Sequence, residues 1–353
     1  MPSRRRFIAV CAVMAAASHV SWAGAGGPAW LSAARRPDGG YGLYGLSPDL
    51  RISFEVPLPG RGHAAAAHPF RPIAVAFARR PGVIALVIDC ASGQVTAQLT
   101  APEGRHFYGH GVFSADGRRL YTIENDFENG AGIVGVWSVE GGYRRLGEFS
   151  SGGVGPHDIR RGPDGLLVIA NGGIDTHPDS GRAKLNLPTM QSNIAVLTSE
   201  GAVRTTRTMP AKYRLNSIRH LSVNGAGHVA FACQWQVDPV MSPPLIGMFD
   251  MAIGTMKVFE QAAHLATPME GYAGSIAFAN DGASIATTSP RGGISAIFGA
   301  EGRLLRTKSA PDLCGVAPYG PDGFIMTTGD GRVFSKHSQV SYPLAWDNHL
   351  IAV

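Results

Sequence analysis

Histidines recur at one position of a repeated pattern in this 353-residue sequence, and imidazole nitrogens are good metal ligands. Each histidine begins a short apolar stretch, as in HGVFSADGRRLYTIEND from His110 and HDIRRGPDGLLVIANGG from His157. Two further copies carry Ser275 or Cys314 at that position. A carboxylate near a histidine can join it as a ligand or orient its ring. The predicted metal ligands are His63, His110, His157, Asp158, His220, Asp312, Cys314 and His349.

The same residues also allow a purely structural interpretation. A polar side chain at the start of a strand can hydrogen-bond a neighbouring element or ordered water without holding any ligand. Clusters of ionisable groups in a cleft favour a functional site instead. Neutral imidazole suits iron, copper, zinc or nickel, and two to four of these side chains, together with water, would be enough to hold one ion. Both interpretations stay open at this level.

The elements that position these residues are hairpins repeated along the chain. Each copy is a short apolar strand, a turn of the Asp-Gly or Asn-Gly kind, and a second strand rich in Val, Ile, Ala and Thr. The copies start at residues 63, 110, 157, 220, 275, 314 and 349. Such spacing leaves room for two more strands per copy, which is typical of four-stranded propeller blades. The sequence therefore predicts an all-β, seven-bladed β-propeller of the WD40 or YVTN-like kind.

The two ends of the chain are predicted to close the ring. The last copy, HLIAV, holds only an innermost strand, and residues 29–58 can supply the outer strands of the same blade. This pairing leaves no unpaired sheet edge, so residues 29–353 form a single domain. The first strand of each blade lines the central channel, which places the histidines in a ring at one mouth. The Gly- and Pro-rich insertion 171–191 is expected to lie over one face.

The N-terminus reads as a targeting segment. Residues 1–23 carry Arg4-Arg5 before Phe7, then a modestly apolar stretch and Ser-Trp-Ala, which predicts a twin-arginine signal peptide cut after Ala23. A short linker, 24–28, follows. We therefore expect a periplasmic protein with no membrane span in the mature chain. Without the three signal arginines, 28 basic residues face 26 acidic ones, so charge gives no support to nucleic-acid binding.

Motifs for covalent chemistry are missing from the sequence. It contains no nucleophile elbow, nucleotide loop, Walker motif or HExxH, and no catalytic residue is predicted. Cys90 and Cys233 are expected to be buried small apolar residues. Cys314 is left as a metal ligand, a redox thiol or a packed cysteine. Whether the protein is an enzyme stays open, but these absences favour binding.

Several longer stretches resemble a known family. They are HPFRPIAVAFARRPG (68–82), YGHGVFSADGRRLYTIEND (108–126), GVGPHDIR (153–160), NSIRHLSV (216–223), YAGSIAF (272–278), DLCGVA (312–317) and AWDNHL (345–350). Together they resemble the bacterial domain-of-unknown-function family 1513, which are exported, YVTN-like or quinoprotein-amine-dehydrogenase-like propellers. The resemblance covers nearly all of the mature chain. Its members are often encoded beside imelysin-type proteins and a di-haem oxidase-like protein, which implies a role in periplasmic iron or copper handling.

These observations favour a monomeric periplasmic propeller that binds a transition metal, or a metal complex, at a histidine-lined channel mouth. Iron or copper is the expected metal, in an uptake system with imelysin-type partners. One alternative is an oxidoreductase that uses a metal or quinone in the same channel. Another is a protein-interaction scaffold. Propellers host all three roles, so the fold does not choose among them.

Overall fold

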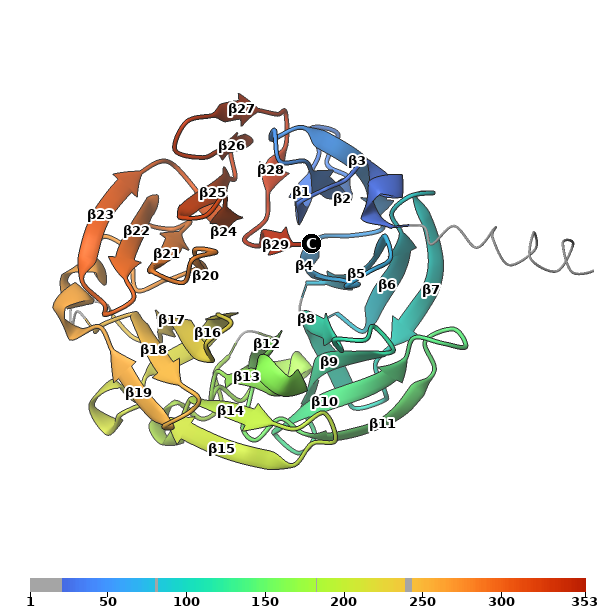
Figure 1. Cartoon of the computed structure of the whole chain (residues 1–353). Coiled ribbons are helices and arrows are strands. Elements are labelled where there is room, and N and C mark those ends of the chain that lie inside the picture. The colour runs from blue at the N-terminus through green and yellow to red at the C-terminus, as the bar shows by residue number, and fades with distance from the viewer. Residues whose placement is uncertain (1–20, 80–81, 182, 239–242) are drawn as a thin grey trace, which may run out of the picture.

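Seven four-stranded antiparallel sheets are arranged as blades around a central axis (Figure 1). The computed structural model describes residues 21–79, 82–181, 183–238 and 243–353. The predicted all-β, seven-bladed propeller is confirmed. Most of the predicted signal peptide, residues 1–20, lies outside the described residues.

Six blades are continuous in the chain, and their strands run in order from the channel outwards (Figure 1). Blade 1 has β4 (Gly62–Ala67), β5 (Ile73–Ala78), β6 (Ile84–Asp89) and β7 (Gln94–Thr100). Blade 2 has β8 (Arg105–Phe113), β9 (Arg119–Asp126), β10 (Ala131–Ser138) and β11 (Arg145–Ser150). Blade 3 has β12 (Pro156–Arg161), β13 (Leu167–Asn171), β14 (Asn193–Leu197) and β15 (Val203–Thr208). Blade 4 has β16 (Asn216–Val223), β17 (His228–Trp235), β18 (Ile246–Asp250) and β19 (Thr255–Val258).

The remaining blades complete the ring. Blade 5 has β20 (Ser275–Phe278), β21 (Ser284–Ser289), β22 (Ile294–Gly299) and β23 (Leu304–Ser309). Blade 6 has β24 (Leu313–Tyr319), β25 (Gly323–Thr328), β26 (Arg332–Phe334) and β27 (Gln339–Ser341). Blade 7 joins β28 (Ala345–Trp346) and β29 (Ile351–Ala352) to β1 (Trp30–Arg35), β2 (Tyr41–Leu46) and β3 (Ile52–Leu58). Short 3₁₀ turns occupy Trp22–Ala25, Pro163–Gly165, Pro178–Ser180, Leu187–Thr189, Ala211–Tyr213 and Glu260–Leu265.

The core lies between neighbouring blades rather than at the channel. One cluster, for example, packs Val75 and Phe77 of blade 1 against Phe107 and Leu120 of blade 2. The middle strands are buried on both faces, as in the fully buried β14, whereas the outermost strands such as β15 are mostly exposed. This gradient explains why the inner hairpin of each copy is the apolar signal in the sequence.

Closure of the ring follows the predicted pairing of the chain ends. In β1, Ala34 lies opposite Trp346 of β28, and Trp30 lies opposite Ala352 of β29. The innermost strand of blade 7 is therefore interrupted, and the interruption contains His349. The C-terminus ends near the centre of the ring (Figure 1).

The inner strands of four other blades lose regular register where their histidines stand. Between Phe107 and Gly111, β8 carries extra residues that have no partner position in β9. Similar shifts fall between Gly62 and Ala65 in β4, Pro156 and Asp158 in β12, and Ile218 and His220 in β16. Bulges of this kind redirect side chains and are common beside functional sites. Here they turn the histidines toward the channel.

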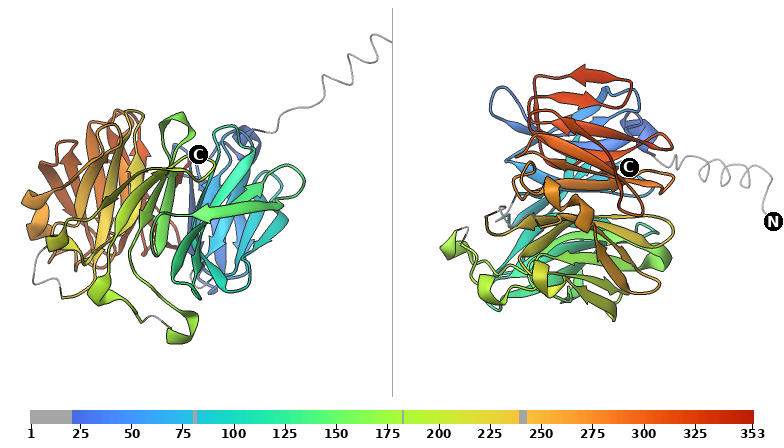
Figure 2. Two further views of the ribbon diagram at one scale, coloured as in Figure 1. Left: turned by 90° about the horizontal axis from the view of Figure 1, so that it is seen from below. Right: turned by 90° about the vertical axis from the view of Figure 1, so that its left-hand side faces the viewer.

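Two segments outside the blades add to the channel mouth and the rim. The predicted insertion 171–191 contains two of the 3₁₀ turns and projects from one face of the ring (Figure 2). At the N-terminal end, the Trp22 indole donates a hydrogen bond to the His68 carbonyl at 2.9 Å, and Ala25 of the predicted linker is buried. Within the described ranges, no helix has the length and apolar character needed to cross a membrane.

Candidate metal centre

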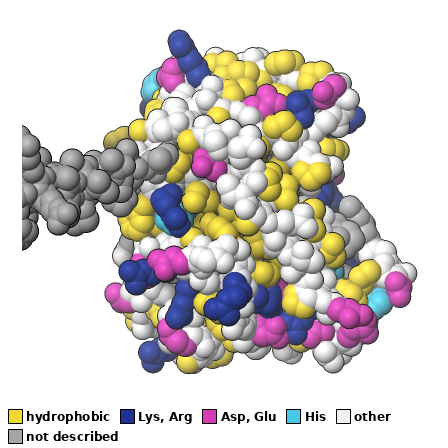
Figure 3. Space-filling view, turned by 90° about the vertical axis from the view of Figure 1, so that its right-hand side faces the viewer, with side chains coloured by type: hydrophobic (Ala, Val, Ile, Leu, Met, Phe, Trp, Pro, Cys, Tyr) yellow, Lys and Arg dark blue, Asp and Glu magenta, His cyan; other side chains and the backbone are white. Residues whose placement is uncertain are grey.

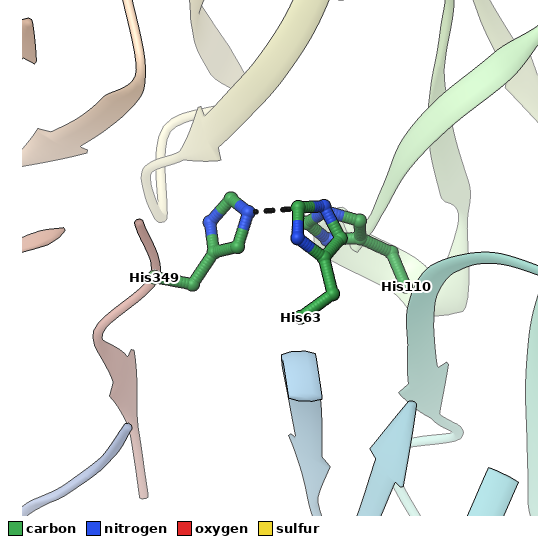
Figure 4. A group of neighbouring side chains, drawn as sticks. All are labelled: His63, His110 and His349. Carbon is green, nitrogen blue, oxygen red and sulfur yellow. Dashed lines mark hydrogen bonds between the residues drawn. The ribbon is translucent and has the colours of Figure 1, made fainter. Parts of the chain in front are cut away.

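Five histidines from five blades meet in the channel, and we call them the histidine cluster: His63, His110, His157, His220 and His349. The ring centroids of His63 and His349 are 4.5 Å apart, and those of His157 and His220 are 5.0 Å apart. His110 is buried, as are His220 and His349. Figure 4 shows His63, His110 and His349 turned toward one another. Residues separated by 286 positions in the chain are thus neighbours in the channel.

Two overlapping groups in the histidine cluster have metal-binding geometry. In each, one nitrogen per ring lies within 4.8 Å of the others. The groups are His63, His110, His349 and His110, His157, His220. His110 belongs to both groups, so its orientation determines which nitrogen it can offer to a metal in either group.

Asp158 fixes the orientation of His110. The Asp158 Oδ1 atom lies 3.2 Å from His110 Nδ1. Because a carboxylate can only accept, Nδ1 carries the proton and the lone pair of the neutral ring is on Nε2. This Nε2 atom is buried and has no hydrogen-bond partner in the described part of the chain. A carboxylate–histidine pair with a free distal nitrogen is the arrangement that protein metal sites use.

The Asp158 carboxylate is itself held firmly. It accepts backbone N–H groups from Ile159 and Leu221, both at 2.9 Å, and its Oδ2 lies 3.2 Å from the Arg160 guanidinium. Burial alone would raise the pKa of Asp158, but the charge of Arg160 and the contact with His110 outweigh it and hold the pKa well below its usual range. Asp158 therefore stays ionised and acts on His110 as a fixed acceptor.

The His157 ring is also held with its Nδ1 as the donor, but by a different partner. Its Nδ1 lies 3.0 Å from the Arg219 backbone carbonyl, which can only accept, so Nδ1 is the donor. The lone pair of the neutral His157 ring is therefore on Nε2 as well.

His106, four residues before His110, is a useful contrast. Its Nδ1 faces the Phe107 carbonyl at 3.1 Å and its Nε2 faces the Asn125 amide at 3.3 Å, so both nitrogens are engaged.

The other members of the histidine cluster also present ring nitrogens to the centre. His63 Nε2 and His349 Nε2 are 3.3 Å apart (Figure 4). The Nδ1 atoms of His63 and His220 are buried and lack a hydrogen-bond partner among the described residues. Unpaired buried nitrogens are costly and call for an explanation such as a bound ion or water.

Burial keeps these rings neutral. It lowers the pKa of His63, His157 and His349 well below the ordinary histidine value. Burial, together with the neighbouring His110, lowers the pKa of His220 to about 3. Neutral imidazole is the form that binds metal. These four rings are thus in the neutral, metal-binding form at neutral pH.

Three predicted ligands lie outside both metal-capable groups of the described chain: Asp158, which contacts His110, and Asp312 and Cys314. Cys314 is buried, and its Sγ lies 3.4 Å from Asp312 Oδ1, so these two contact each other instead. Burial and the Asp312 charge raise the pKa of the Cys314 thiol strongly. Cys90 and Cys233 are buried, as expected for small apolar residues.

A cavity of about 440 Å³ opens onto one side of the histidine cluster. His63, His157 and His220 line it, together with Arg79 and Arg291. No repeat position in the sequence singled out these two arginines. Arg79 follows β5 and Arg291 follows β21, and a hairpin returns its second strand to the mouth where the first began. The residues that follow each second strand could therefore have been predicted to lie at the same mouth as the histidines.

The fold and the site together define the class: a seven-bladed β-propeller with a buried histidine cluster in its channel. Residues 56–353 match the family described as "Protein of unknown function (DUF1513)", so the chain belongs to that family. No curated protein matches the sequence.

Solved structures share the fold at low sequence identity. A chain of Kuenenia stuttgartiensis hydrazine synthase is similar with a TM-score of 0.63 and 12% identity, over 88% of this chain and 96% of that one. The Cps50 (Swd1) β-propeller domain of Myceliophteria thermophila is similar with a TM-score of 0.60 and 9% identity, over 88% and 91%. At such identities the likeness concerns the fold alone.

Proposed function

We propose that this protein is a periplasmic binding protein that holds one transition-metal ion, iron or copper, in the histidine cluster. The observation that carries the proposal is the His110 Nε2 atom, which is buried and unpartnered in the described structure while Asp158 holds the opposite nitrogen. A metal ion would satisfy this atom, and imidazole nitrogen is a suitable donor for both metals.

One ion, rather than two, agrees with the bonding of His110. Its Nδ1 is committed to Asp158, so only Nε2 can serve as a ligand. The two histidine groups compete for that single nitrogen. We therefore expect one ion per chain, with the remaining rings close enough to complete or exchange ligands.

Binding needs no covalent chemistry from the chain. The residues would deliver neutral nitrogen donors in a preorganised pocket, which lowers the cost of ordering them around the ion. The periplasmic location rests on the twin-arginine pattern in residues 1–23. The iron or copper assignment, with an imelysin-type partner, rests on what the family resemblance implies.

The test is the metal content of protein exported natively and purified without chelators. We expect close to one iron or copper per wild-type chain and none in His110→Ala/His157→Ala. The matched control is His264→Ala/His337→Ala, which removes two exposed histidines far from the cluster and should keep the metal. Equal metal content in the two double variants would contradict the proposal.

A second assay separates binding from catalysis. Metal-loaded wild type should not reduce or oxidise a quinone in steady state. Turnover that disappears in His110→Ala/His157→Ala would replace the binding function with the oxidoreductase alternative.

A further inference from the structure

The cavity beside the histidine cluster is strongly basic. Three of its lining residues are arginines contributed by three blades or their loops: Arg79, Arg219 and Arg291. Its described lining includes no Asp or Glu. On the side of the ring shown in Figure 3, by contrast, basic and acidic side chains are interspersed. The cavity is therefore set apart by charge of one sign.

Four acidic side chains around the cavity contact other side chains of the described chain. Asp158 is paired with Arg160, and Asp347 is paired with Arg61 at 2.6 Å. Glu128 and Asp179 lie 3.9 and 3.7 Å from His177, and both are exposed.

Neighbouring groups respond to this positive environment. Burial, followed by the charges of Arg219 and Arg291, lowers the pKa of Lys184, whose ammonium group donates to the Gln236 carbonyl at 3.1 Å. A cation in the histidine cluster would meet the same environment. Neutral imidazoles contribute no charge, so an iron or copper ion would add its full positive charge beside three guanidinium groups.

We infer that the arginine-lined cavity binds a small carboxylate anion that serves as a co-ligand of the metal in the histidine cluster. This rests on the proposed metal binding, but the cavity can be tested for the anion without metal. Its volume of about 440 Å³ falls within the range of small-molecule sites. The planar guanidinium fork matches a carboxylate in two parallel hydrogen bonds.

The geometry of the arginines supports preorganisation and coupling. The Arg291 guanidinium lies over the Tyr272 ring at 4.5 Å, and the Tyr272 hydroxyl accepts from the Asn348 amide at 3.3 Å. These contacts hold one wall of the cavity. Arg219 has a double position, since its side chain lines the cavity while its carbonyl orients His157. A ligand on Arg219 therefore acts directly beside a metal ligand.

Isothermal titration calorimetry with citrate as the probe tests this inference. Citrate should bind metal-free wild type, and Arg219→Gln/Arg291→Gln should weaken it at least tenfold. The matched control is Arg204→Gln/Arg144→Gln, which removes two exposed arginines elsewhere and should leave citrate affinity unchanged. If the buried Arg219 change prevents folding, the exposed Arg291→Gln variant alone should still weaken citrate binding. Arginine-independent binding, or none, would overturn the inference.

Copper-loaded protein then tests the co-ligand role. Citrate should bind it more tightly than metal-free protein, with copper retained after the titration. Equal affinity, or removal of copper by citrate, would overturn the role as co-ligand. Copper binding without citrate binding would leave the proposed function intact, whereas arginine-dependent citrate binding without copper binding would overturn the metal proposal and leave an anion site. Titration of metal-free protein with a copper–citrate complex formed in advance tests whether the metal and the carboxylate bind together as a complex or one after the other.

Discussion

Blades 5 and 6 differ from the five blades that supply histidines, although all seven share the same repeat. At the equivalent position of blade 5, Ser275 pairs regularly with Thr288, and its hydroxyl accepts from Val316 N at 3.3 Å. In blade 6, the Cys314 carbonyl accepts from the Thr288 hydroxyl. Polar groups here hold one blade to the next. In blades 1, 2 and 4 the histidine at the same position keeps a buried ring nitrogen that has no hydrogen-bond partner among the described residues.

The backbone explains part of this difference. The β20–β21 pair in blade 5 keeps its register throughout, whereas the inner strands of blades 1 to 4 are bulged at the histidines. The inner strand of blade 6 is also shifted, between Leu313 and Val316, so this reason applies to blade 5 alone. A regular strand pairs its polar groups with a neighbour, and a bulge frees a side chain to point elsewhere. One repeat position can thus hold blades together or build a site.

The largest expected effect comes from removing one central ring. His110→Ala should lower metal affinity by more than about 100-fold. Replacing a residue that only orients a metal ligand already lowers the affinity about 10–100-fold, and His110 is a ligand itself. Ser275→Ala, at the same position of blade 5, should leave affinity unchanged. Competition titration with a chromogenic chelator measures both. Equal losses would erase the distinction between the two kinds of blade.

The bulge in blade 2 can be broken at Gly109. This residue has φ +96°, and a Cβ there would lie 2.4 Å from the His63 ring. Gly109→Ala should therefore destabilise the protein by about 2–3 kcal/mol. Gly147→Ala is the control, because a Cβ at that outer-strand position meets no atom within 4 Å. Urea unfolding of the two variants should separate them, and equal stability would show that the bulge tolerates a side chain.

A smaller effect is expected from the residue that orients His110. Asp158→Asn keeps the shape but removes the charge, and metal affinity should fall about 10–100-fold. Asp312→Asn in blade 6 is the matched change, and it should have no effect because Asp312 contacts Cys314 rather than a ring of the histidine cluster. An effect of Asp312→Asn as large as that of Asp158→Asn would extend the site into blade 6.

The smallest expected effect concerns a histidine that the structure uses only for folding. His68 Nδ1 accepts backbone N–H groups from Phe70 and Arg71 at 3.1 and 3.0 Å, and burial lowers the pKa of His68 to about 4. The unfolded state therefore binds this proton more readily, so the contribution to stability is present above about pH 6.5 and is lost as pH falls toward 4.

Replacement of His68 should flatten that pH dependence. His68→Asn retains a side-chain acceptor at the turn and should remove about 1–2 kcal/mol of the stability change of metal-free protein between pH 7 and 5. Thermal or urea unfolding at both pH values measures it. A variant with the same pH dependence as wild type would assign that dependence to other groups. Metal affinity at pH 7 should stay the same.

The fold was largely predictable because its signals are local. Asp-Gly turns between apolar strands mark each hairpin, and the truncated copy at His349 requires an N-terminal partner to close the ring. The gathering of histidines followed from the repeat as well. Since every copy contributes its inner strand to one channel, residues at one repeat position must approach one another.

The detail of the site was not predictable for physical reasons. Bulges depend on packing across blades, so the sequence did not separate Asp158, which contacts His110, from Asp312, which contacts Cys314. Arg79 and Arg291 stand at the ends of second strands, where no repeat signal singled them out. Their approach to the histidines exists only once the ring is closed.

X-ray absorption spectroscopy of copper-loaded protein tests the central claim most directly. The spectrum should show three or four nitrogen ligands at about 2.0 Å with the multiple scattering of imidazole. This signature should disappear in His110→Ala/His157→Ala and persist in His264→Ala/His337→Ala. Failure of wild type to hold copper in a one-to-one ratio, or an unchanged imidazole signature in His110→Ala/His157→Ala, would contradict it.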